Sequence, residues 1–134
     1  MPVQGKPLTY PYNTHNFNPP APVLEVSLVR PDPSSSGHTF VCPALLDTGA
    51  DITAIPKRAT QQLQLRYVDE TDVSGYEGIL RRVPVFSVRV VFINLGDYVI
   101  RCVETEDDFV LLGRDILNRW DLFLRGRSGE FNIS

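Results

Sequence analysis

The chain has 134 residues, a formal net charge of −3 and 43% hydrophobic residues. This length supports one buried core and is too short for two lobes. The 13 Lys and Arg residues are scattered, with Arg81-Arg82 the densest central pair, so the charge pattern argues against a nucleic-acid-binding protein and favours a peptide or protein partner.

Targeting, membrane and redox signals are weak in this sequence. The amino terminus lacks a basic start followed by an apolar stretch, and no window approaches the ~20 apolar residues of a membrane span. We therefore expect a soluble cytoplasmic protein without membrane contact. Cys42 and Cys102 lie in apolar runs without metal-ligand spacing, so we expect two buried free thiols.

The first part of the chain predicts an extended arm and then two strands. Residues 1–22 are rich in Pro and Asn, which favours an arm with neither helix nor strand ladder. The domain then spans residues 23–134. Alternation from Val23 predicts a half-buried strand with Leu24, Val26 and Leu28 inward. Residues 39–46 form a second strand, in which Pro43 indicates an edge position or a bulge.

The rest of the chain predicts a mainly β domain with one or two short helices. A helix follows Pro56 over residues 57–65, with Ala59 and Leu63 inward. Further strands are expected at 68–79, 83–93, 98–103 and 110–112, helical turns at 114–119, and a closing hairpin at 120–133. The acidic stretch 104–108 is interpreted as a solvated loop in preference to a cation site.

The most informative stretch is Asp47-Thr48-Gly49-Ala50-Asp51, which follows the apolar strand ending at Leu46. A carboxylate at the end of a buried strand, followed by a hydroxyl and a glycine, has the rigid base and tight turn that catalysis requires. A lone Asp-Thr-Gly triplet is weak evidence. Its context is stronger, because roughly 60 residues later an apolar strand leads into Gly113-Arg114-Asp115 and a short helix.

Together these motifs resemble the retropepsin-like (retroviral-type) aspartic proteases over about residues 23–133. The helix after the Asp47 loop is similar in arrangement to the retroviral-protease-like domain of ubiquitin-shuttle proteins. The resemblance implies a closed β-barrel-like monomer that is active as a two-fold homodimer, an aspartic endopeptidase that needs neither metal nor organic cofactor. Hydrophobic residues would be preferred at the cleavage site, because the walls are apolar.

The resemblance also implies roles for single residues. Asp47 is the catalytic acid, paired with Asp47 of a second copy because the motif occurs once, and Thr48 and Gly49 complete the catalytic loop. Asp51 and Arg114 would form a half-buried ion pair, with two independent surface charges as the alternative. Gly113, Arg114 and Asp115 would support the loop structurally. The substrate-binding residues would be Ala50 and Asp51 of the loop and a flap tip formed by Gly75, Tyr76, Glu77, Gly78 and Ile79.

Several other interpretations stay open. The fold could serve a non-catalytic dimerisation or peptide-binding module that adds an extended segment as a strand. The Gly75–Gly78 tip could be a plain hairpin turn. A calcium site at Asp47 and Asp51 is disfavoured because few oxygen ligands cluster there. Leu45, Ile52, Ile55 and Val110 are interpreted as core residues in preference to walls of a binding site.

Overall fold

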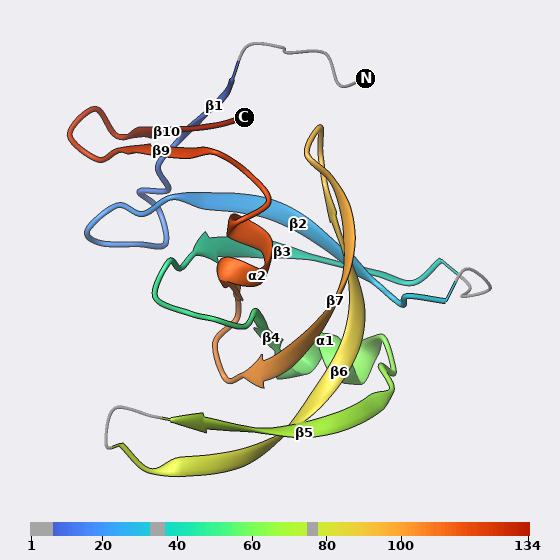
Figure 1. Ribbon diagram of the computed structural model, residues 1–134. Helices are drawn as coiled ribbons and strands as arrows, with labels where there is room; N and C mark the ends of the chain where they lie inside the picture. Colours follow the sequence, from blue (N-terminus) through green and yellow to red (C-terminus); the bar gives the residue numbers. More distant parts are fainter. Residues whose placement is uncertain (1–6, 33–36, 75–77) are drawn as a thin grey trace.

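The computed structural model describes residues 7–32, 37–74 and 78–134, which form a closed β-barrel with two short helices (Figure 1). The main sheet has the strand order β2-β3-β8-β4-β7-β6-β5, and a second pairing of β2 with β6 closes it into a barrel. β5 stays outside the closed ring, paired with β6 alone. The predicted mainly β, barrel-like fold with short helices is confirmed.

Seven strands form the main sheet, and the sequence pattern of β2 shows how its residues alternate between core and surface. They are β2 (Val23–Val29), β3 (Thr39–Leu46), β4 (Ala54–Pro56), β5 (Tyr67–Ser74), β6 (Leu80–Phe92), β7 (Gly96–Thr105) and β8 (Val110–Leu112). In β2 the residues Leu24, Val26 and Leu28 are buried, as their alternation predicts. Pro43 is paired with Glu25 of β2 on one side, and β8 covers the other side of β3 only from Ala44 onward. Pro43 therefore lies at a locally unpaired edge.

The helices are shorter than the sequence suggests. α1 (Lys57–Gln62) follows Pro56, and Ala59 and Leu63 are buried under it as predicted. It ends before residue 65 because Gln64 takes a positive φ of 50°, which an α-helix cannot accommodate. α2 (Arg114–Leu117) is one turn of helix, with Ile116 and Leu117 buried against the barrel.

The expectation that residues 1–22 contain no strand is wrong. β1 (Leu8–Pro11) pairs antiparallel with β10 (Glu130–Ile133), which pairs in turn with β9 (Leu122–Arg125). The physical reason is aromatic packing, because Tyr10 stacks on the fully buried Phe131 with ring centroids 5.2 Å apart. Figure 1 shows this three-stranded sheet above the barrel.

The two cysteines are buried free thiols, as predicted. Burial raises the pKa of the Cys42 thiol to about 11 and that of Cys102 to about 12. Both groups therefore stay protonated near neutral pH and behave as small core residues. In the described part of the chain, neither helix has the length and apolar character needed to cross a membrane.

The packing of β1 gives a first prediction. Replacing Tyr10 by Ala removes the ring that covers Phe131, so we expect the free energy of unfolding to fall by about 2 kcal/mol. Chemical denaturation measures the change, and Tyr10→Phe, which keeps the stacked ring, is the matched control. An unchanged midpoint for Tyr10→Ala would show that β1 adds nothing to the stability of the domain.

Candidate functional site

The parallel pairing of β3 with β8 brings the two sequence motifs together. Leu45 pairs with Leu111 and Leu46 with Leu112, so the loop after β3 and the start of α2 emerge at the same edge. The ladder continues past the end of β3, because the Asp47 N–H donates to the Leu112 carbonyl at 2.9 Å. The Asp47 motif is thereby anchored to the Gly113 motif by backbone bonds.

Asp47 is half-buried at the start of the loop that leads to β4. Its Oδ1 accepts a hydrogen bond from the Gly49 N–H at 3.0 Å, and its carbonyl accepts one from the Ala50 N–H at 3.1 Å. A Cβ on residue 49 would stand 3.3 Å from this Oδ1, which is tight. The glycine therefore lets the backbone turn around the carboxylate while the carboxylate stays partly open to solvent.

Gly113 lies where two backbone segments approach each other closely. A Cβ at this position would stand 2.8 Å from the Ile52 carbonyl carbon and 3.1 Å from the Ala50 carbonyl oxygen. These neighbours are backbone atoms, so a side chain here would displace the loop. The same approach lets the Arg114 N–H donate to the Ala50 carbonyl at 2.8 Å.

Asp115 and Thr53 form the polar contact that holds the loop against α2. Oδ2 of Asp115 accepts from the Thr53 N–H at 3.1 Å, and Oδ1 accepts from the Thr53 hydroxyl at 2.7 Å. The same hydroxyl oxygen accepts from the Gly113 N–H at 3.1 Å. Thr53 is fully buried, so its hydroxyl satisfies two partners that water does not reach.

Thr53 was not among the residues that the sequence singled out. Its signal is a polar residue inside the apolar run Ile52-Thr53-Ala54-Ile55, which is compatible with a buried hydroxyl that bonds to the backbone. Asp115 and Gly113 were predicted to support the loop. In the structure Asp115 accepts a hydrogen bond from the Thr53 N–H, and Gly113 lies directly against the backbone of Ala50 and Ile52.

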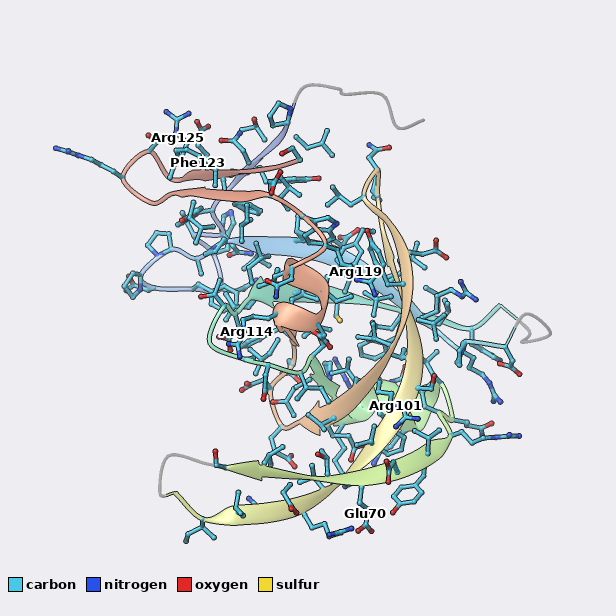
Figure 2. All side chains as sticks on the ribbon, viewed as in Figure 1. Glu70, Arg101, Arg114, Arg119, Phe123 and Arg125 are labelled. Carbon is cyan, nitrogen blue, oxygen red and sulfur yellow. The ribbon has the colours of Figure 1, made fainter. Side chains whose placement is uncertain are left out.

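The predicted ion pair between Asp51 and Arg114 is wrong. Among the ion pairs of residues 7–32, 37–74 and 78–134, none joins these two side chains, and both are exposed. Arg114 instead donates from its guanidinium to the Thr48 carbonyl at 2.9 Å. Figure 2 shows Arg114 near the start of α2. The Arg114 side chain thus supports the loop by bonding to its backbone, and the Asp51 side chain is exposed to solvent.

The expected flap falls partly outside the described residues. Gly75, Tyr76 and Glu77 lie there, whereas Gly78 has a positive φ of 71° and Ile79 is 60% exposed. β5 and β6 pair as far as Ser74 with Leu80, so the two strands form a long hairpin.

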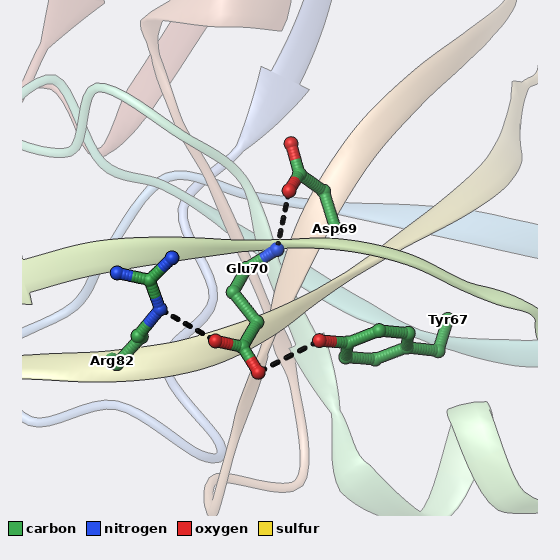
Figure 3. A network of polar contacts seen from close by, with 4 residues as sticks. All are labelled: Tyr67, Asp69, Glu70 and Arg82. Carbon is green, nitrogen blue, oxygen red and sulfur yellow. Dashed lines mark hydrogen bonds and ion pairs between the residues drawn. The ribbon is translucent and has the colours of Figure 1, made fainter.

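The middle of that hairpin is fastened by a surface network (Figure 3). The Tyr67 hydroxyl donates to Glu70 at 2.8 Å, and Arg82 donates to the other carboxylate oxygen at 2.5 Å. These two donors, the Tyr67 hydroxyl foremost, lower the pKa of Glu70. The network crosses from β5 to β6 and fixes the register of the hairpin.

An apolar surface lies between the Asp47 loop and this hairpin. Ala54, Val85 and Val103 form a small buried cluster, with Ile52, Val83 and Leu111 packed around it. Leu45 and Ile52 are half-buried, whereas Ile55 and Val110 are fully buried core residues. The interpretation of all four as core therefore holds for two of them.

Neither the hollow described next nor the acidic residues after β7 include residues of the Asp47 loop. A hollow of about 670 Å³ is lined by residues 8–15, 23–25 and 92–95. None of these residues belongs to the Asp47 loop. In the described part of the chain, no three His, Cys, Asp or Glu side chains are grouped as metal ligands. Glu106, Asp107 and Asp108 are exposed in the loop after β7, as predicted, although residues 104 and 105 belong to that strand.

The sequence matches one known protein family. Residues 36–119 match the family model described as "gag-polyprotein putative aspartyl protease". A comparison with curated protein sequences finds no significant match.

Solved structures show the same fold at low identity. A retropepsin-like aspartic protease from Rickettsia conorii is 17% identical, covers 96% of this chain and 90% of its own, and has a TM-score of 0.63. EIAV protease complexed with an inhibitor is 22% identical, covers 81% and 91%, and has a TM-score of 0.58. Simian Foamy Virus (mac) protease is 16% identical, covers 72% and 92%, and has a TM-score of 0.53.

The buried network at the loop gives a second prediction. Replacing Thr53 by Val removes the hydroxyl, which leaves the Gly113 N–H without its partner and leaves Asp115 Oδ1 with the Ile116 N–H alone. We therefore expect a loss of about 2 kcal/mol in the free energy of unfolding. Denaturant unfolding measures it, with Thr53→Ser as the control that keeps the hydroxyl. Equal losses for both substitutions would assign the effect to packing and contradict the hydrogen-bond account.

Proposed function

The chain belongs to the gag-polyprotein aspartyl protease family, and from this membership we propose that it is an aspartic endopeptidase that acts as a two-fold homodimer. The observation that carries the proposal is the placement of Asp47. Its carboxylate is half-buried at the end of a barrel strand, held by the Gly49 N–H and partly open to solvent. This is the environment in which a carboxylate can bind and activate a water molecule.

A single chain supplies one such carboxylate. The sequence contains one Asp-Thr-Gly triplet. The carboxylate of Asp115 accepts hydrogen bonds from the Thr53 N–H and hydroxyl, and Asp51 is exposed. Because aspartic proteolysis uses two carboxylates around one water, the second comes from another copy, and a two-fold axis beside Asp47 makes the two loops equivalent.

Two features support a second copy as the partner. Thr48, next to Asp47, is exposed in the isolated chain, which leaves its hydroxyl free to bond across the axis. β9 is an end strand of the three-stranded sheet, and Phe123 on it is 65% exposed. A strand with one unpaired edge and exposed apolar side chains is a template for association. Figure 2 shows Phe123 near the upper edge of the molecule.

The chemistry then follows from two carboxylates placed face to face. Two like charges a few ångströms apart cannot both ionise readily, so the pair of Asp47 side chains shares one proton. The ionised carboxylate draws a proton from the water, which attacks the peptide carbonyl carbon. The protonated carboxylate donates a hydrogen bond to the carbonyl oxygen and stabilises the tetrahedral intermediate. A proton passed to the leaving nitrogen completes the hydrolysis.

The residues near Asp47 suggest how a peptide is held. Ile52, Val83 and Leu111 present apolar surface between the loop and the β5–β6 hairpin, which favours hydrophobic side chains around the cleaved bond. Ala50 and Asp51 lie on the loop itself, where Asp51 is exposed and able to accept peptide N–H groups. Gly78 and Ile79, just before β6, would contact the peptide from the side of the hairpin.

The central test is Asp47→Asn, which is nearly isosteric and abolishes the shared proton chemistry. We expect cleavage of a hydrophobic peptide library to fall by at least about 10³-fold while the thermal midpoint stays close to that of the wild type. Product formation is followed by mass spectrometry. Equal cleavage by both proteins would overturn the proposal, and peptide binding without cleavage by the wild type would favour the peptide-binding module instead.

Thr48→Val tests the dimer. If the hydroxyl bonds across the axis, its loss weakens association by about 1–3 kcal/mol, and activity falls in parallel at low protein concentration. Sedimentation gives the dissociation constant, and Thr48→Ser serves as the control that keeps the hydroxyl. Full activity from a strict monomer would contradict the homodimer.

A further inference from the structure

The face of the sheet that carries Asp47 continues away from it as an apolar strip. Along β3, Cys42, Ala44 and Leu46 point into the core, so Pro43, Leu45 and Asp47 lie on the opposite face. The parallel register sets Leu111 of β8 beside Leu45. Phe109, which directly precedes β8, lines a hollow together with Pro43. Pro43, Leu45, Phe109 and Leu111 are all half-buried.

This strip ends in a hollow of about 580 Å³ that Pro43 and Phe109 line together with Phe17 from the amino-terminal segment. The rings of Phe17 and Phe109 meet edge to face, with centroids 5.1 Å apart. We call it the Phe17 hollow. An aromatic pair is thus held at the end of the surface that begins at the catalytic loop, and half of that pair comes from outside the barrel.

The rim of the Phe17 hollow is acidic. Glu106, Asp107 and Asp108 line it and are exposed. Within the residues that the structure describes, no Lys or Arg forms an ion pair with any of the three. Lys57 follows Pro56, the register partner of Thr105, yet it makes no such pair. The hollow therefore combines an aromatic floor with uncompensated negative charge.

A basic side chain matches this combination. The aliphatic stem of Arg or Lys packs on aromatic surface while its charged end stays at the wet, acidic rim. A cation is also attracted to the face of an aromatic ring. Neither a purely apolar nor an acidic side chain would satisfy both halves of the hollow.

The distance from Asp47 sets which residue of a peptide reaches the hollow. Pro43 precedes Asp47 by four positions, roughly 13 Å along an extended strand. A peptide bound in extended form along the strip spans that distance with three or four residues. In a two-fold dimer an equivalent hollow lies on each side of the cleavage point.

We propose that the Phe17 hollow is a distal subsite that takes an Arg or Lys side chain three or four residues from the cleaved bond of a peptide substrate. The inference rests on the proposed protease function. It gives the amino-terminal segment a part in substrate selection, and it adds a charge preference to the hydrophobic preference near Asp47.

The test uses three matched peptides with the same hydrophobic pair at the cleavage site. One carries Arg three or four residues away, one carries citrulline, the neutral analogue of Arg, and one is truncated before that position. We expect kcat/KM for the Arg peptide to exceed that for the citrulline peptide by about fivefold, and the ratio to fall at high salt.

The combined variant Glu106→Gln, Asp107→Asn, Asp108→Asn should bring this ratio close to one and leave cleavage of the citrulline peptide unchanged. Asp121→Asn, an exposed carboxylate outside the hollow, is the control and should keep the preference. Phe17→Ala should raise KM for the Arg peptide and leave the truncated peptide unaffected. Thermal melting confirms that each variant is folded.

The outcomes separate the two proposals. Cleavage of the Arg and citrulline peptides at equal rates by the wild type would overturn the subsite and leave the protease intact. A preference for Arg that survives neutralisation of the three carboxylates would overturn it as well. Failure to cleave any of the peptides, including the truncated one, would overturn the proposed function and the subsite with it.

Discussion

The buried contact between Thr53 and Asp115 is the constraint on which the rest of the site depends. It joins the chain just after the Asp47 loop to the first turn of α2, and the same hydroxyl receives the Gly113 N–H. Hydrogen bonds to an ionised carboxylate inside a folded domain are among the stronger ones. These contacts fix the end of the loop, and the hydrogen bond from the Asp47 N–H to the Leu112 carbonyl fixes its start. Together they hold the backbone of Asp47 in place.

This arrangement explains why two motifs that lie far apart in the chain behave as one unit. The parallel pairing of β3 with β8 brings them to one edge, Gly113 allows the backbones to touch, and Arg114 reaches back to the Thr48 carbonyl. Each of these contacts acts on backbone atoms. A site built in this way tolerates sequence change on its outer surface, provided the small and polar residues beneath it are kept.

The sequence predicted single strands and the position of the Asp47 loop because these depend on local signals, whereas the closed barrel was implied by the resemblance to a known family. Alternation reveals β2 and β3, and the Asp-Thr-Gly motif marks a tight turn after a buried strand. The side-chain contacts around the loop were harder to predict. Choosing Asp115 over Asp51 as the anchored carboxylate requires knowing that Thr53 faces α2, which no periodicity encodes. The strand Leu8–Pro11 was missed for a similar reason, since its partner lies at the other end of the chain.

That last pairing has a consequence for how the domain folds. Thr9 on β1 bonds to Asn132 on β10, 123 positions further along the chain. β1 can therefore pair only after residues 130–133 have been synthesised, and loop closure over such a span is slow compared with local hairpin formation. Assembly of the three-stranded sheet therefore waits until β9 and β10 have been made, although β1 is the first strand of the domain.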